Sequence, residues 1–151
     1  MVELRKAHAA EAERLTHLAL RSKALWGYDA EFMRACVPAL TIPPERVVRE
    51  LFFVLDDGER LIGMVGLRGL GPEDAELTNM FVEPTAIGHG HGRRLFEHAV
   101  GVARARGWRR LLISSDSFAE GFYLRLGAAR IGESASDAIP GRMLPLLALE
   151  L

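Results

Sequence analysis

Hydrophobic residues recur along the chain with two different spacings, and the spacing changes from one segment to the next. Alternating or continuous apolar runs predict strands, and apolar residues three and four positions apart predict helices. The strand-like runs cover residues 2–6, 51–55, 61–67, 75–82, 108–114, 128–132 and 143–151. The helix-like runs cover residues 9–26, 29–40 and 118–126, with a long segment between residues 92 and 107. The order β-α-α-β-β-β-α-β-α-β-β predicts an α/β domain with a mixed sheet.

Local signals refine the ends of these elements. Asp57-Gly58 between two apolar runs predicts a tight hairpin turn. Ser117 and Glu120 have the spacing of a capping box, which predicts a helix start at that point. Pro145 lies inside the last apolar run and predicts an edge strand or a bulge. The first long helix is expected to bury one stripe, formed by Leu15, Leu18, Ala19, Ser22 and Leu25.

One segment combines a strand end, a glycine-rich turn and a helix start. The strand ends at Pro84, because proline cannot donate a hydrogen bond to a neighbouring strand. Gly88, Gly90 and Gly92 follow at every second position, and glycine lets a backbone approach a ligand closely. A helical pattern with two arginines in its first turn begins at once. Because the free amides and the dipole of a helix N-terminus favour an anion, the segment predicts a phosphate-binding turn.

The composition is that of an ordinary globular protein. Its 151 residues suit one domain, which is expected to span residues 1–151. Nineteen basic and twenty acidic residues give a net charge of −1, which argues against a nucleic-acid partner. The single cysteine, Cys36, excludes an intrachain disulfide, lies in a helical pattern that predicts burial, and favours a reducing, cytoplasmic location. No apolar run has the length of a membrane span, so no membrane partner is expected, and a homodimer is left open.

A second group of polar and aromatic residues follows the strand at 108–114. Segment 116–128 reads Asp-Ser-Phe-Ala-Glu-Gly-Phe-Tyr-Leu-Arg-Leu-Gly-Ala. The hydroxyl of Tyr123 could donate a proton or a hydrogen bond to a leaving group. Taken alone, Tyr123 is better explained as a core residue beside Phe122.

The glycine turn resembles motif A of the GNAT superfamily, the acetyl-CoA-dependent N-acetyltransferases. The family pattern is Gln/Arg-x-x-Gly-x-Gly/Ala after a strand. Gly90 and Gly92 occupy the two small positions, and Ile87 stands where the family has Gln or Arg. This departure removes one side-chain contact to the pyrophosphate and leaves the backbone contacts.

Segment 116–128 resembles a second GNAT pattern, Asn-x-x-Ala-x-x-x-Tyr-x-x-x-Gly-Phe. Ala119, Tyr123 and Gly127 match in register, Asp116 replaces the asparagine that contacts pantetheine, and Ala128 replaces the aromatic residue. With both motifs present, the functional role of Tyr123 is favoured over the structural one. The resemblance implies a GNAT-like mixed twisted sheet with helices on both faces, in a single domain.

The resemblance also implies acetyl-CoA as a cosubstrate, held where two parallel strands splay apart. Backbone groups of the first strand would pair with pantetheine, and amides of the glycine turn would hold the pyrophosphate. The cofactor-binding residues predicted in this way are Phe81, Val82, Ile87, Gly88, His89, Gly90, His91, Gly92, Arg93, Asp116 and Ala119.

For the chemistry, the resemblance implies direct attack of a primary amine on the thioester in a ternary complex. Tyr123 would protonate the leaving thiolate. Glu76, on the strand before the cleft, is the predicted base, and a water oriented by Thr78 or Asn79 is the alternative. Glu83, at the phosphate end, is better explained as a solvated carboxylate.

The acceptor is expected to be a small-molecule amine, although a protein acceptor is left open. The region that walls the acceptor site in this fold offers Trp26, Tyr28 and Asp29, and the loop at 139–142 adds Arg142. Asp29 and Arg142 together would suit an acceptor that carries both an ammonium group and a carboxylate. Solvated surface residues are the simpler explanation of both side chains.

The motifs are less consistent with other functions. Gly88-x-Gly90-x-Gly92 is neither the dinucleotide-binding fingerprint nor a P-loop. His89-x-His91 offers two metal ligands without a third nearby, so no metal is expected. A non-catalytic acyl-CoA-binding or interaction module on the same fold is the alternative function, and Tyr123 argues against it.

Overall fold

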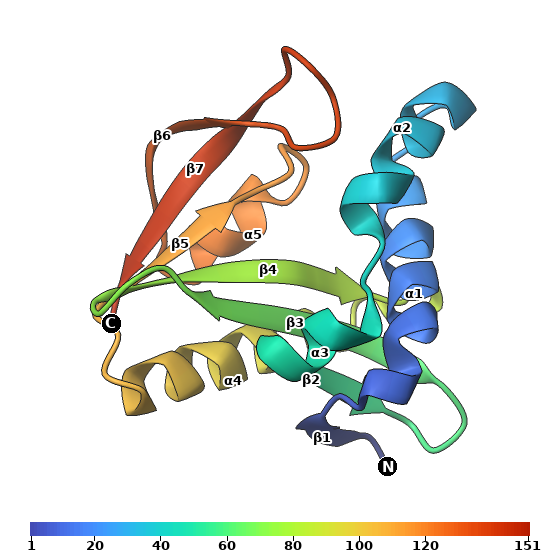
Figure 1. Ribbon diagram of the computed structural model, residues 1–151, viewed down its shortest axis with the longest axis horizontal. Coiled ribbons are helices and arrows are strands. Elements are labelled where there is room, and N and C mark those ends of the chain that lie inside the picture. The colour runs from blue at the N-terminus through green and yellow to red at the C-terminus, as the bar shows by residue number, and fades with distance from the viewer.

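The computed structural model describes residues 1–151 and shows one seven-stranded sheet in the order β1-β2-β3-β4-β5-β7-β6 (Figure 1). All neighbouring strands are antiparallel except β4 and β5, which are parallel. The strands are β1 (Glu3–Lys6), β2 (Leu51–Asp56), β3 (Leu61–Gly69), β4 (Asp74–Val82), β5 (Arg110–Ser114), β6 (Ala129–Ala135) and β7 (Met143–Glu150). The helices are α1 (Ala12–Ala24), α2 (Ala30–Leu40), α3 (Pro44–Arg49), α4 (His91–Ala105) and α5 (Glu120–Arg125), with 3-10 turns η1 (Ala9–Glu11) and η2 (Pro84–Ala86). The predicted mixed sheet is therefore confirmed.

Helices pack on both faces of the sheet, as expected. Side chains on a strand point alternately to opposite faces, and β2 shows this clearly. Phe52 and Val54 join a buried cluster with Leu15 and Leu18 of α1. Leu55 joins a second cluster, to which α4 and α5 contribute. The apolar faces of α1 and α4 are buried in this way, which is the main source of stability for such helices.

A β-bulge changes the course of β4. Met64 of β3 pairs with Phe81, but Gly66 pairs with Thr78, so two residues of β4 lie opposite one residue of β3. Asn79, in the bulge, has a φ of 48°. Its side-chain oxygen accepts a hydrogen bond of 2.8 Å from Arg46 of α3.

The two parallel strands separate just before this bulge. Their pairing ends at Glu76 and Leu112, although β4 continues to Val82 and β5 to Ser114. Figure 1 shows β5, β7 and β6 diverging from β4, with α5 beside β5. The diverging ends leave the edge of β4 that faces β5 without a strand partner.

Several local expectations are confirmed. Cys36 is fully buried in α2. The Asp57-Gly58 hairpin joins β2 and β3, and Gly58 has the positive φ that such turns require. No helix has both the length and the hydrophobicity needed to cross a membrane.

Three local expectations are wrong. Leu25 is not in the buried stripe but is half exposed, because α1 ends at Ala24. Ser117 does not cap α5, which begins at Glu120; the preceding turn is held instead by the Asp116 carboxylate, which accepts a hydrogen bond of 3.0 Å from the Phe118 amide. Pro145 is not at a sheet edge, because β7 lies between β5 and β6. It is tolerated there because the pairing of β7 with β5 begins only at the next residue, Leu146, and a β-bulge of β6 lies opposite Leu146 and Leu147.

Candidate active site

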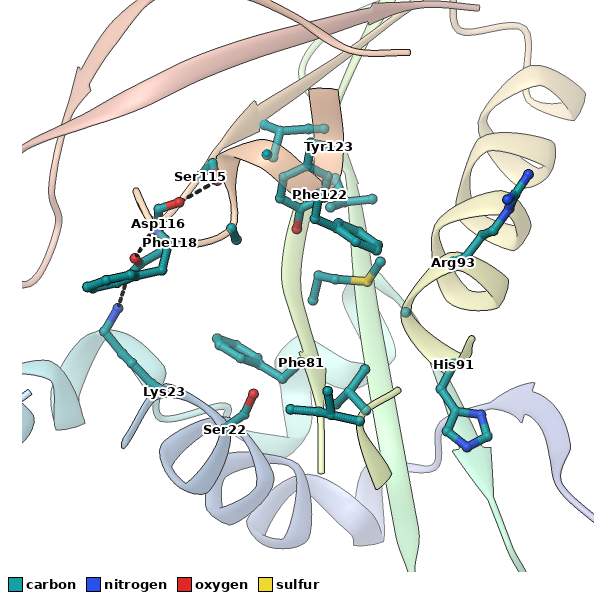
Figure 2. Close-up of a pocket in the computed structure, with 18 of the residues that line it drawn as sticks. Ser22, Lys23, Phe81, His91, Arg93, Ser115, Asp116, Phe118, Phe122 and Tyr123 are labelled. Carbon is teal, nitrogen blue, oxygen red and sulfur yellow. Dashed lines mark hydrogen bonds and ion pairs between the residues drawn. The ribbon is translucent and has the colours of Figure 1, made fainter. Parts of the chain in front are cut away.

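The separated ends of β4 and β5 open into a cavity of about 670 Å³ (Figure 2). Its wall is built from both strands, the end of α1, the start of α4 and the α5 segment. Half of the lining residues are hydrophobic, and glycines and polar side chains make up the other half. A cavity that combines apolar walls with placed polar groups is typical of a cofactor or substrate site.

The glycine turn forms one end of this cavity. Gly88 and Gly90 have φ values of 92° and 80°, a conformation that favours glycine, and a side chain at either position would meet no neighbouring atom. Gly90 is also the N-cap of α4, so the free amides of the first turn of α4 lie beside the cavity. This arrangement can hold an anion by backbone hydrogen bonds and the helix dipole.

The two arginines of that turn are already engaged by other groups. The Arg93 guanidinium donates a hydrogen bond of 2.7 Å to Glu97. Arg94 donates to the Val2 carbonyl at 3.0 Å. The positive charge near the turn therefore supplements the backbone amides rather than replacing them.

The structure brings together all but one of the predicted cofactor-binding residues. Those that line the cavity are Phe81, Val82, Ile87, Gly88, Gly90, His91, Gly92, Arg93, Asp116 and Ala119. The exception is His89, which does not line the cavity. Its Nδ1 lies 3.2 Å from the Ala86 carbonyl oxygen. Burial, together with the neighbouring His89 and Arg94, lowers the pKa of His91 below its usual value. No group of three potential metal ligands is present.

The ring of Tyr123 is buried, and its hydroxyl is directed at the cavity. Its ring packs in the larger hydrophobic cluster and only 6% of the residue is exposed. The hydroxyl points into the cavity (Figure 2) and makes no hydrogen bond to the rest of the protein. Burial raises the pKa of the hydroxyl above its usual value, so it is protonated at neutral pH and can act as a donor.

The predicted base lies elsewhere. Glu76 is not part of the cavity lining, and its carboxylate forms an ion pair with Arg68 on the neighbouring strand β3. The sequence predicts a solvated Glu83, and this prediction is wrong. Its carboxylate is buried and pairs with Arg21 of α1 at 2.7 Å. Of Glu76, Thr78 and Asn79, the residues of β4 named for proton removal, only Asn79 lines the cavity.

Asp116 is the centre of a polar cluster at the opposite end of the cavity. It accepts hydrogen bonds from the Tyr28 hydroxyl at 2.8 and 3.0 Å and lies 3.0 Å from the Lys23 ammonium group. Arg142 donates to the Tyr28 hydroxyl at 2.9 Å and lies 3.5 Å from Asp116. We call Lys23, Tyr28, Asp116 and Arg142 the Asp116 cluster.

These contacts fix the protonation of the cluster. Burial alone would raise the pKa of Asp116, but hydrogen bonds from the Phe118 amide, Tyr28 and Lys23 outweigh it and hold that pKa below its usual value. Burial, followed by the hydrogen bond to Asp116, raises the pKa of Tyr28 to about 12. At neutral pH Asp116 is therefore ionised and Tyr28 is neutral.

The predicted acceptor residues fall into two groups. Tyr28 and Arg142 belong to the Asp116 cluster, and Trp26 lines the cavity, where its ring stacks on Phe118 with a centroid separation of 5.3 Å. Asp29 lies outside the cavity lining, because its carboxylate caps α2 by accepting a hydrogen bond of 2.8 Å from the Phe32 amide. Sequence reasoning does not identify Lys23 or Phe118, since neither belongs to a motif and their role depends on contacts with distant segments.

Comparisons with known proteins bear on this site. The profile of the Acetyltransferase (GNAT) family matches residues 13–128. A search of curated proteins found no match. The chain belongs to the GNAT acetyltransferase family. It is accordingly an acetyl-CoA-dependent acyltransferase.

Solved structures share the fold at low sequence identity. The PaiA N-acetyltransferase from Thermoplasma acidophilum, in complex with coenzyme A, has a TM-score of 0.81 and 18% identity, over 100% of this chain and 99% of its own. A GCN5-related N-acetyltransferase from Rhodopseudomonas palustris has a TM-score of 0.81 and 18% identity, over 99% and 95% of the two chains. The N-acetylglutamate synthase from Neisseria gonorrhoeae, complexed with coenzyme A and N-acetyl-glutamate, has a TM-score of 0.69 and 21% identity, over 100% of this chain and 35% of its own. These structures confirm the predicted fold.

Proposed function

We propose that the protein transfers the acetyl group of acetyl-CoA to a primary amine of a small molecule, by direct attack within a ternary complex. The observation that carries this proposal is that one cavity joins three features. These are the anion-binding glycine turn, the unpaired edge of β4 and the free hydroxyl of Tyr123. The first two suit a long thioester cofactor, and the third suits its leaving group.

The cofactor would lie along the cavity from the glycine turn to Tyr123. Amides between Gly88 and Arg93 would hold the pyrophosphate, in the manner of anion sites at helix N-termini. Ile87 has no polar group for this purpose, so the backbone supplies the contacts. The pantetheine amides would pair with the free edge of β4 near Phe81 and Val82, as an added strand pairs with a sheet.

Direct transfer needs one bond to form, one to break and one proton to move. The neutral amine attacks the thioester carbonyl carbon, the C–S bond breaks, and the CoA thiolate takes a proton from the hydroxyl of Tyr123, which regains a proton from water. The amine loses a proton to water, because Glu76 is bound to Arg68 outside the cavity. Asn79, which lines the cavity, is the polar group of β4 best placed to orient that water. Much of the rate would come from holding amine and thioester together.

The test is thiol release from acetyl-CoA with a panel of amines, analysed together with calorimetry of acetyl-CoA binding. The panel contains amino acids, alkylamines, polyamines and short peptides, so a peptide acceptor is detected as well. We expect amine-dependent thiol release with at least one small molecule and appearance of its acetylated form. Binding of acetyl-CoA without thiol release for any amine would leave only the cofactor assignment and overturn the transferase proposal.

A further inference from the structure

The Asp116 cluster contains more positive charge than its own carboxylate balances. Lys23 and Arg142 both pair with Asp116, and neither has another carboxylate within 4.0 Å. The side chains of Lys23, Asp116 and Arg142 are only 14%, 15% and 21% exposed. The cluster therefore carries a net charge of +1 in a position with little access to water. The rings of Tyr28 and Phe32, which lie within 5.1–5.8 Å of both cations, offset part of this charge, and an anion would offset the rest.

Both cations keep hydrogen-bond donors that nothing in the protein uses. Arg142 bonds through Nη2 alone, which leaves its Nη1 and Nε free. Lys23 makes one hydrogen bond, to Asp116, and an ammonium group has three donors. A guanidinium edge and an ammonium group are the donors that carboxylates prefer in proteins.

The cluster lies at one end of the cavity, next to exposed aromatic surface. Lys23 and Asp116 line the cavity (Figure 2). Arg142 does not belong to the lining but lies 3.5 Å from Asp116. Trp26 and Phe118 line the same end, and they are 42% and 54% exposed although they are large and apolar. Exposed aromatic rings beside a cavity commonly bind ligand rather than fill a core.

We infer that the acceptor is a small amine that also carries a carboxylate and an apolar group. The carboxylate binds to the free donors of Lys23 and Arg142, and the apolar group packs on Trp26 and Phe118. This inference rests on the proposed acetyl transfer and specifies its substrate class. It assigns Asp116 to the acceptor side, where it holds the two cations, rather than to pantetheine.

The experiment compares pairs of amines that differ in a carboxylate. Suitable pairs are phenylalanine with 2-phenylethylamine, leucine with isopentylamine, and 4-(aminomethyl)benzoate with benzylamine. We expect kcat/KM for the carboxylate member to exceed that of its partner by about tenfold to a hundredfold, the range for hydrogen bonds to charged groups. The preference should lie mainly in the acceptor KM.

Two variants and one matched control locate the effect. Lys23→Met keeps the aliphatic stem without the charge, and Arg142→Gln removes the second cation. Each should reduce the preference about tenfold or more through the acceptor KM, with the KM for acetyl-CoA unchanged. Lys6, the other lysine of the chain, is exposed on β1, so Lys6→Met should leave every parameter as in the native protein.

The outcomes separate this inference from the proposed function. Equal rates for both members of each pair, or a preference that survives in both variants, would overturn the carboxylate subsite while acetyl transfer stands. A peptide or polyamine acceptor preferred over all carboxylate members would do the same. If no amine releases thiol, calorimetry with N-acetylphenylalanine and N-acetyl-2-phenylethylamine in the presence of CoA decides the inference. Tighter binding of the carboxylate ligand supports the subsite, and equal or absent binding refutes it.

Discussion

Replacing Tyr123 by phenylalanine isolates the role of a single hydroxyl. The ring packs in the hydrophobic cluster, and the substitution keeps that packing. Because the hydroxyl makes no hydrogen bond to the protein, its removal costs no internal bond, and we expect the free energy of unfolding to change by less than about 1 kcal/mol. A loss of activity in a variant whose stability is nearly native then reports on chemistry rather than on folding.

The expected loss follows from the proton that the CoA thiolate must receive. General acids contribute about 10²–10⁴-fold, which corresponds to about 2.7–5.4 kcal/mol of transition-state stabilisation. The raised pKa of Tyr123 keeps the donor protonated at neutral pH, so the full effect should be visible there. The affinity for acetyl-CoA should stay close to native, because the hydroxyl acts on the leaving group.

A single-turnover assay measures this step without interference from product release. Enzyme in excess over acetyl-CoA is mixed with a saturating acceptor, and acetylated product is followed in time. The other tyrosine provides a contrast: Tyr28→Phe removes a hydroxyl that bonds to Asp116 and Arg142, so it should lower stability by about 1–3 kcal/mol and raise the acceptor KM. A single-turnover rate for Tyr123→Phe within threefold of native would refute the assignment of Tyr123 as proton donor.

Three further predictions concern the glycine turn, the sheet and a half-buried histidine. Gly90→Glu should weaken acetyl-CoA binding at least tenfold in calorimetry, because its carboxylate repels the pyrophosphate. The control Gly107→Glu, at a similar φ of 83° beyond the other end of α4, should leave binding unchanged. Equal effects of the two substitutions would refute the phosphate site. Gly66→Ala should lower the free energy of unfolding in urea by about 1–3 kcal/mol, because its Cβ would clash with Thr78 Oγ1 and lie 3.0 Å from a ring carbon of Phe52, and an unchanged midpoint would contradict this. The pKa of His98 is lowered by burial and by Arg94, so protonation favours the unfolded state and stability should fall as the pH drops below about 6.5. Urea unfolding at pH 7.5 and 5.5 should show a smaller fall for His98→Leu than for the native protein, and an equal fall would exclude this histidine as the cause.

The features that the sequence predicts are those encoded by neighbouring residues. The glycine turn, the start of α4 and the place of Tyr123 depend on short spacings, and the structure has them in one cavity. The alternation of apolar residues likewise predicts the sheet, because each strand buries its own faces.

The features that the sequence does not reveal depend on long-range contacts. Asp116 matches a motif position, but its oxygens are taken by Lys23, Tyr28 and Arg142, which come from distant parts of the chain. Glu76 has the strand position expected of a base, yet its ion pair with Arg68 depends on strand register. Asp29 has the charge expected of a residue that binds the substrate amine. It serves instead as a helix cap, because the amides in the first turn of α2 need a hydrogen-bond acceptor.

The double position of Tyr123, inside the larger hydrophobic cluster and at the cavity wall, links activity to folding. The exclusion of water that raises the pKa of its hydroxyl is produced by the same close packing that stabilises the fold. A substitution that loosened this packing, such as a smaller side chain at Phe96, whose ring lies 5.9 Å from that of Tyr123, would admit water and move that pKa toward its ordinary value. Substitutions that destabilise this cluster should therefore shift the alkaline limb of the pH–rate profile as well, even when no substituted residue touches a substrate.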